Sequence, residues 1–311
     1  MNNLILKWPL LLALGAVSVF TSCEDDDDPG VPPNPTVVGI AQSDTSFSIL
    51  VAALQKANLV GTLSASTGNF TVFAPTNNAF RAAGITTSVI AAYTPTEVTN
   101  VLTPILTYHV LGSKVNASGV PVSDTVKTVN GKNLFASKNA NGVFVNGVRV
   151  VTADLNASNG VVHVIGSVLI PPTKTIAQIV IDDPANFSLL LSAVSRADLA
   201  ATLSGPGKFT VFAPVNSGFP ASLDTDAEII AAPVATVAGI VGSHAFATNI
   251  FAGDLVAGNT GATVNPATTL TIALSPASVK ITGSANPASV VTATNIVATN
   301  GVVHVIDKVL Q

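Results

Sequence analysis

The chain has 311 residues, of which 48% are hydrophobic and only 10% are charged. One basic and five acidic residues fall within positions 1–28, so the totals of 13 basic and 17 acidic residues leave 12 of each sign in the remainder. A formally neutral remainder lacks the basic excess with which proteins bind phosphate backbones, and this excludes nucleic acid as a partner.

The first residues have the pattern of a cleaved leader. Lys7 precedes an apolar run over positions 8–20, which is shorter than a membrane span and typical of the apolar segment of a signal peptide. Cys23, the only cysteine, follows small residues and resembles the lipidated cysteine of a bacterial lipobox. We therefore expect a lipoprotein signal peptide over 1–22, lipidation at Cys23, and a membrane contact made by that lipid anchor.

The next segment, 23–37, is predicted to be a disordered linker. Five consecutive acids from Glu24 to Asp28 repel one another and stay solvated, and the proline-rich stretch 29–35 favours a semi-rigid stalk. An acidic run behind a lipidated cysteine also resembles the export signal of surface lipoproteins in Bacteroidetes; a plain spacer is the alternative. The expected location is the outer membrane, on the cell surface or on its periplasmic face.

The rest of the chain contains the same sequence pattern twice. Three separated blocks recur, namely 47–50 at 187–190, 69–77 at 208–216 and 159–165 at 300–306. Their offsets are 140, 139 and 141 residues. A nearly constant offset indicates tandem duplication of a unit that is domain-sized, far longer than a solenoid repeat.

The first half of repeat 1 is predicted to be mainly helical. Apolar residues at helical spacing over 47–57 predict a helix capped by Ser43 or Asp44. A buried strand is expected at Thr71–Phe73, ended by Ala74 and Pro75, and a short helix is expected from Asn77. The capping box over 94–97 opens a helix toward Tyr108, which Pro104 should kink or split.

The second half has the pattern of short strands. The β-rich runs are 126–129, 134–136, 143–145, 148–151 and 161–165. Asn130-Gly131 and Asn146-Gly147 lie between such runs and predict type I′ hairpin turns. Helices followed by hairpins predict an α+β fold with mainly antiparallel strands.

Each repeat therefore carries Thr-Val-Phe-Ala-Pro followed by Asn, a His at the end of the central helix, and Asn-Gly-Val-Val-His-Val-Ile. This combination resembles the fasciclin-type adhesion domain. The resemblance implies two tandem domains, 38–171 and 175–311, each a β-wedge packed with several short helices, in which the first and last blocks pair as strands. The residues of its structural motif are Thr71, Phe73, Pro75, Asn77, His163, Thr210, Phe212, Pro214, Asn216 and His304.

The family also carries a Tyr-His pair that is linked to adhesion and integrin contact in animal members. Repeat 1 has Tyr108-His109, whereas repeat 2 has Ser243-His244. Tyr108, His109 and His244 are thus the candidate binding motif, with a core role as the alternative. We do not extend the integrin contact of the animal members to this chain, because its leader resembles that of a bacterial lipoprotein.

The remaining two histidines favour a structural role. His163 and His304 stand within apolar strands, where a histidine is expected to bond backbone groups. A zinc site needs three or four ligands, and none lie at ligand spacing, so neither a metal nor a cofactor is predicted.

These observations predict a non-enzymatic adhesion protein, since the sequence has no nucleophile elbow, Walker loop or paired-carboxylate motif. The expected partner is an extracellular protein or polysaccharide, and the oligomeric state is left open. A ligand- or glycan-capturing subunit of an envelope uptake system is the first alternative, and a hydrolase the second.

Overall fold

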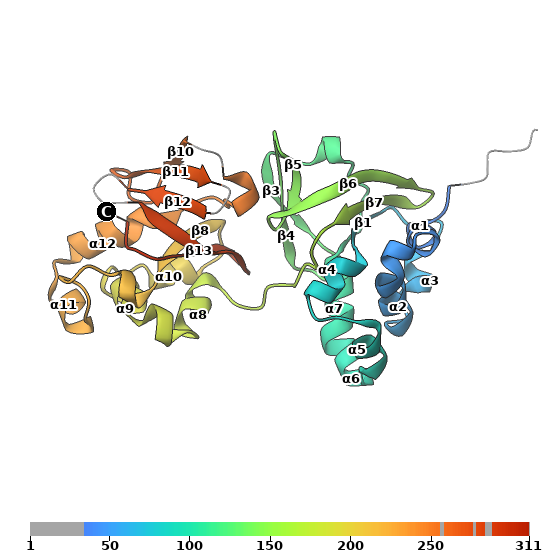
Figure 1. Cartoon of the computed structure of the whole chain (residues 1–311), viewed down its shortest axis with the longest axis horizontal. Coiled ribbons are helices and arrows are strands. Elements are labelled where there is room, and N and C mark those ends of the chain that lie inside the picture. Colours follow the sequence, from blue (N-terminus) through green and yellow to red (C-terminus); the bar gives the residue numbers. More distant parts are fainter. Residues whose placement is uncertain (1–33, 256–257, 276–277, 284–287, 311) are drawn as a thin grey trace, which may run out of the picture. The chain divides into compact units, whose positions relative to one another are not determined.

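The computed structural model describes residues 34–255, 258–275, 278–283 and 288–310 (Figure 1). The predicted signal peptide, Cys23 and the acidic run lie outside the described residues. Among the described helices, none alone has the length and apolarity of a membrane span. One pair, Val37–Ser43 with Thr45–Lys56, meets the length and composition of a span only when its two helices are joined across a 107° bend.

The helices of domain 1 precede most of its strands, as predicted. They are α1 (Val37–Ser43), η1 (Thr45–Phe47), α2 (Ser48–Lys56), α3 (Val60–Leu63), α4 (Asn77–Ala82), α5 (Thr87–Ala92), α6 (Pro95–Glu97), η2 (Val98–Leu102), α7 (Thr103–Tyr108) and η3 (Ala117–Gly119). The predicted cap of the helix over 47–57 is wrong, because Asp44 caps the short η1 through Ser46 N, whereas α2 has Phe47 at its N-cap and no side-chain cap bond. The predicted capping box at Thr94 is present.

The predicted break at Pro104 is confirmed. The helical run that starts at Pro95 passes through a π-helical segment, η2, before it continues as α7 with Pro104 in its first turn. Proline has no N–H to donate, and a wider turn ahead of it accommodates the missing bond and the ring.

Domain 1 contains a seven-stranded sheet in the order β2-β1-β7-β6-β5-β4-β3. Its strands are β1 (Phe70–Pro75), β2 (Val110–Leu111), β3 (Ser123–Lys127), β4 (Asn133–Asn139), β5 (Gly142–Val145), β6 (Val148–Ala157) and β7 (Gly160–Ile165). Only β1 and β7 pair in parallel, with Thr71 opposite Val161 and Phe73 opposite His163. The expected pairing of the first and last blocks, and the mainly antiparallel sheet, are confirmed.

Local details of the sheet differ from expectation in four places. The predicted run 126–129 overlaps β3 (Ser123–Lys127) only in its first half. Asn146 (φ 48°) and Gly147 (φ 74°) form the predicted type I′ geometry, but at the other turn only Gly131 (φ 83°) has positive φ. Strand β1 continues through Pro75, because pairing with β7 extends to Ile165. Strand β6 continues past the predicted end at 151 through an irregular register at Asp154 (φ 59°).

Domain 2 repeats this architecture. Its helices are α8 (Ile176–Ile181), α9 (Pro184–Arg196), α10 (Ala200–Ser204), η4 (Asn216–Gly218), α11 (Asp226–Ala231), α12 (Val234–Ser243) and η5 (Ala252–Asp254). Its strands are β8 (Phe209–Pro214), β9 (Ala245–Phe246), β10 (Gly258–Ala262), β11 (Thr269–Ser275), β12 (Ser278–Thr282), β13 (Ser289–Ala298) and β14 (Gly301–Ile306). They form a sheet in the order β10-β11-β12-β13-β14-β8-β9. The α+β class therefore holds for both domains.

Each domain has two apolar cores, one on either face of its central strands. In β1, Val72 and Ala74 belong to the core formed with the helices, whereas Phe73 belongs to the core formed among the strands. Successive side chains of a strand point to opposite faces, so both faces of β1 are buried. Burial on both faces explains why the Thr-Val-Phe-Ala-Pro block of β1 is mainly apolar.

Candidate functional site

Thr71 and Asn77 fix the segments that flank the paired strands. The buried Thr71 hydroxyl donates to Ser113 O (2.7 Å) and accepts from Val115 N (2.8 Å). Asn77 Oδ1 accepts from Ile49 N (3.0 Å), which satisfies a free donor at the start of α2. Thr210 and Asn216 make the equivalent bonds in domain 2.

His109 is buried at the end of α7 and bridges two backbone groups. Its Nε2 accepts from Leu169 N (2.9 Å), so the proton is on Nδ1, which donates to Ile105 O (2.8 Å). His244 does the same with Leu310 N and Ile240 O, both at 2.8 Å. Burial lowers the pKa of both imidazoles to about 4, although the backbone bond to Nδ1 partly opposes the shift.

His163 and His304 bridge the strands to the neighbouring loop. His163 Nδ1 accepts from Asp154 N (3.2 Å) at the irregularity of β6, and its Nε2 donates to Val115 O (2.9 Å). Its ring stacks on Phe73 with centroids 5.6 Å apart. His304 stacks on Phe212 at 5.2 Å, and burial lowers its pKa. The sequence contains no signal for the irregular register that supplies these donors.

Tyr108 lies inside domain 1, with 0% of its side chain exposed. Its hydroxyl donates to Asn133 O and accepts from Asn146 Nδ2, both at 2.9 Å. Burial raises its pKa to about 12, opposed by the Asn146 bond. The buried Ser243 replaces it in domain 2 and bonds Thr268 Oγ1 at 2.9 Å.

The candidate binding motif is therefore internal in this fold. Tyr108, His109 and His244 are buried, and their polar atoms bond within their own domains. These side chains do not form an exposed contact surface. Their role in binding stays a prediction, and it would have to operate through the segments that they position.

Sequence reasoning missed the role of Asn159, which joins three elements. Its Oδ1 accepts from Val37 N (2.9 Å), and its Nδ2 donates to Leu63 O (2.8 Å) and Ala65 O (3.0 Å). Asn300 makes the equivalent bonds in domain 2. The recurrence of Asn ahead of Gly-Val-Val-His was the available signal, although its partners are remote in sequence.

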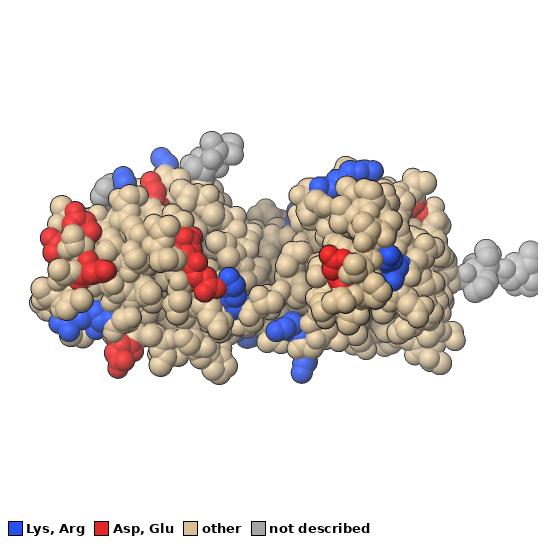
Figure 2. All heavy atoms as spheres, turned by 90° about the horizontal axis from the view of Figure 1, so that it is seen from below, with Lys and Arg blue, Asp and Glu red and all other residues tan. Residues whose placement is uncertain are grey.

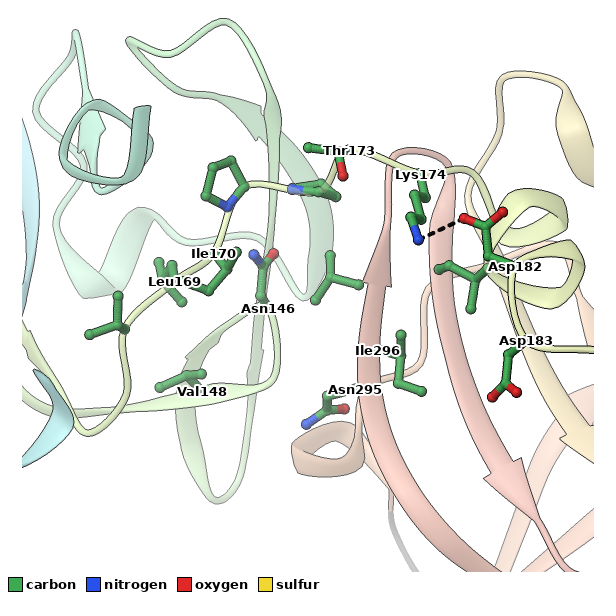
Figure 3. A pocket seen from close by; sticks show the side chains of 15 residues that line it. Asn146, Val148, Leu169, Ile170, Thr173, Lys174, Asp182, Asp183, Asn295 and Ile296 are labelled. Carbon is green, nitrogen blue, oxygen red and sulfur yellow. Dashed lines mark ion pairs between the residues drawn. The ribbon is translucent and has the colours of Figure 1, made fainter. Parts of the chain in front are cut away.

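An open cavity of about 560 Å³ lies beside the segment that connects the two repeats (Figure 3). Asn146, Lys174 and Asn295 are among its lining residues. Lys174 Nζ pairs with Asp182 Oδ2 at 2.6 Å, so the lysine charge is neutralised there. Within the described ranges, no group of three or more His, Cys, Asp and Glu could hold a metal ion.

The surface carries few charges. Figure 2 shows one face of the molecule, on which Lys, Arg, Asp and Glu are scattered between wide areas of uncharged residues. This agrees with the low charged content of the sequence. Such a face offers little electrostatic attraction to a highly charged partner.

Comparison with known proteins identifies the family. The model of the fasciclin domain matches residues 45–171 and again 185–311, so the chain belongs to the fasciclin family. It is 45% identical over 139 residues to Protein sll1483 of Synechocystis sp., which covers 44% of this chain and 74% of that protein. It is 39% identical over 143 residues to the transforming growth factor-beta-induced protein ig-h3 of Sus scrofa, covering 46% of this chain and 20% of that protein.

A solved structure is also similar. It is the domain pair of the insect cell adhesion molecule fasciclin I, with 21% identity, a TM-score of 0.40, and coverage of 84% of this chain and 92% of that chain.

Proposed function

We propose that this protein is a non-enzymatic, lipid-anchored adhesion protein of the cell envelope that mediates contact between cells or with a matrix protein or polysaccharide. The observation that carries the proposal is the twofold match to the fasciclin domain, which occurs in cell adhesion proteins such as insect fasciclin I. Two domains on one anchor add avidity when each contact is weak.

The low surface charge supports an uncharged partner. The remainder after residue 28 is formally neutral, and charged side chains are sparse on the face in Figure 2. An uncharged polysaccharide or protein surface can approach such a face without desolvating many ions. Adhesion at the cell surface further requires the anchor, for which Cys23 is the proposed site.

Attachment assays test the proposal. Cells carrying the wild-type gene, a deletion and Cys23→Ala are compared for aggregation and surface attachment, with the protein located by fractionation. Both mutants should lose attachment, and the Cys23→Ala protein should leave the membrane fraction. Equal attachment in all three strains would contradict adhesion and put ligand capture for an uptake system first.

The geometry around His109 bears on the hydrolase alternative. That alternative calls for an acid or base beside His109 with a perturbed pKa. The pKa is indeed lowered, but both ring nitrogens bond backbone groups inside the domain. A ring held in this way has no nitrogen available to a substrate, so His109 gives the hydrolase alternative no support.

A further inference from the structure

The two domains differ in the apolar space between their first helices and central strands. Domain 2 has a cavity of about 60 Å³ there, whereas the corresponding space in domain 1 is about 10 Å³. The linings share equivalent positions, paired as Val37/Ile176, Val38/Ala177, Ala41/Val180, Leu50/Leu190, Leu54/Val194, Leu63/Leu203 and Val72/Val211. The asparagine bonds to Val37 N and Ile176 N confirm this alignment.

The difference follows from smaller side chains in domain 2. Positions that hold valine in domain 1 and alanine in domain 2 are Val38/Ala177, Val60/Ala200 and Val110/Ala245, and leucine becomes valine at Leu54/Val194 and Leu106/Val241. Three pairs change the other way, Val37/Ile176, Ala41/Val180 and Val51/Leu191. The net loss of side-chain carbon leaves space that a close-packed interior would otherwise fill.

Two of the smaller side chains lie toward the surface. Val38 is buried and Val60 half-buried in domain 1, whereas Ala177 is half-buried and Ala200 exposed. Ile181, which also lines the cavity, is 51% exposed, and domain 1 has the polar Gln42 at that position. Domain 2 therefore has exposed and half-exposed apolar side chains beside its apolar cavity.

The polar atoms that line the cavity already have partners. The Ser204 hydroxyl donates to Ala200 O (2.7 Å), and both nitrogens of His244 bond backbone groups. A water molecule inside would find few groups to bond, and such cavities stay dry and accept apolar ligands.

From these observations we propose that domain 2 binds the end of an aliphatic chain, such as an alkyl or acyl group, in the cavity between α8, α9, α10 and β8. The volume is well below the roughly 150 Å³ of a cavity that takes a benzene ring, which favours a narrow chain over an aromatic ring. The rest of the aliphatic ligand would extend out of the cavity past Ile181. This site is independent of the adhesion proposed above.

Methyl-resolved NMR of the full chain tests the site, with 1-octanol as the probe. Titration should give saturable shifts at the methyl groups of Val180, Leu190 and Val194, and none at the equivalent Ala41, Leu50 and Leu54. The variant Ala177→Val/Ala200→Val restores the domain 1 residues and should weaken the apparent affinity at least tenfold. Ala201→Val, on the exposed side of α10, is the matched control and should bind as wild type does.

Two results would overturn the site. One is the lack of any saturable shift in the wild-type protein, and the other is wild-type affinity in a folded Ala177→Val/Ala200→Val variant. If that variant loses its dispersed methyl spectrum, Ile181→Gln replaces it, because this side chain is at the surface and its change spares the core. Unchanged affinity in Ile181→Gln would equally reject the proposal.

Discussion

Two buried histidines, His109 and His244, make the stability of the protein depend on pH. His109 and His244 have folded pKa values near 4, against 6.5 for an exposed histidine. Between these values the unfolded chain binds more protons than the folded chain, so acid favours unfolding. Their contribution to stability is complete above pH 6.5 and is lost as the pH falls toward 4.

We expect the free energy of unfolding to fall between pH 6.5 and 5, by up to roughly 3 kcal/mol per pH unit for two such groups. Urea unfolding at several pH values measures this slope. The His109→Leu/His244→Leu variant should be less stable at pH 7 but should show a flatter profile. A wild-type profile that is flat across this window would contradict the neutral, buried state of both rings.

Tyr108→Phe tests the buried binding motif. Removing the hydroxyl leaves Asn133 O and Asn146 Nδ2 without this partner, and the expected loss is about 1–3 kcal/mol of unfolding free energy. The half-buried Tyr93 is the only other tyrosine, and Tyr93→Phe is the control, expected to change stability by less. Since Tyr108 is internal, cells with a folded Tyr108→Phe protein should still attach. Loss of attachment despite a native fold would show a direct role for the hydroxyl.

At the scale of elements, the contact between β1 and β7 requires glycine at position 160. A Cβ on Gly160 would overlap the carbonyl oxygen of Phe70, which is backbone and has no side-chain freedom with which to move away. Gly160→Ala should therefore destabilise domain 1 by several kcal/mol, about the range of the most damaging core substitutions.

Gly61→Ala is the matched control for that substitution. Gly61 lies in α3 with no atom within 4 Å of an added Cβ, and alanine there should stabilise by about 0.5–1 kcal/mol. Thermal unfolding of both variants gives the comparison. Similar midpoints for the two proteins would mean that β1 and β7 are not held as closely as the structure has them.

The sequence predicted the order of elements well, because local signals determine them. The capping box at Thr94, the break at Pro104 and the Asn146-Gly147 turn all depend on neighbouring residues. The contacts of Asn159 and the irregular β6 register depend on groups far away in the chain, and no local pattern encodes them. Burial of Tyr108 likewise follows from its place in the core formed among the strands and from bonds to Asn133 O and Asn146 Nδ2, which lie far away in the chain.

For the whole molecule, low charge predicts a contact that salt does not disrupt. Exposed charges are screened within about 8–10 Å at physiological ionic strength, and a charge-driven contact weakens as salt rises. Attachment of cells should therefore change little between roughly 50 and 500 mM NaCl. A steep loss over that range would indicate a charged partner and contradict the neutral one proposed here.

The parallel pairing of β1 with β7 also dictates when each domain can form during synthesis. Thr71 meets Val161, so the central pair of domain 1 joins segments from near its two ends. Until the ribosome releases Gly160–Ile165, β1 has no partner along that edge, and the helices made earlier lack Val162 and Val164 of their core. Domain 1 therefore matures only once its final strand emerges, while domain 2 is still being translated.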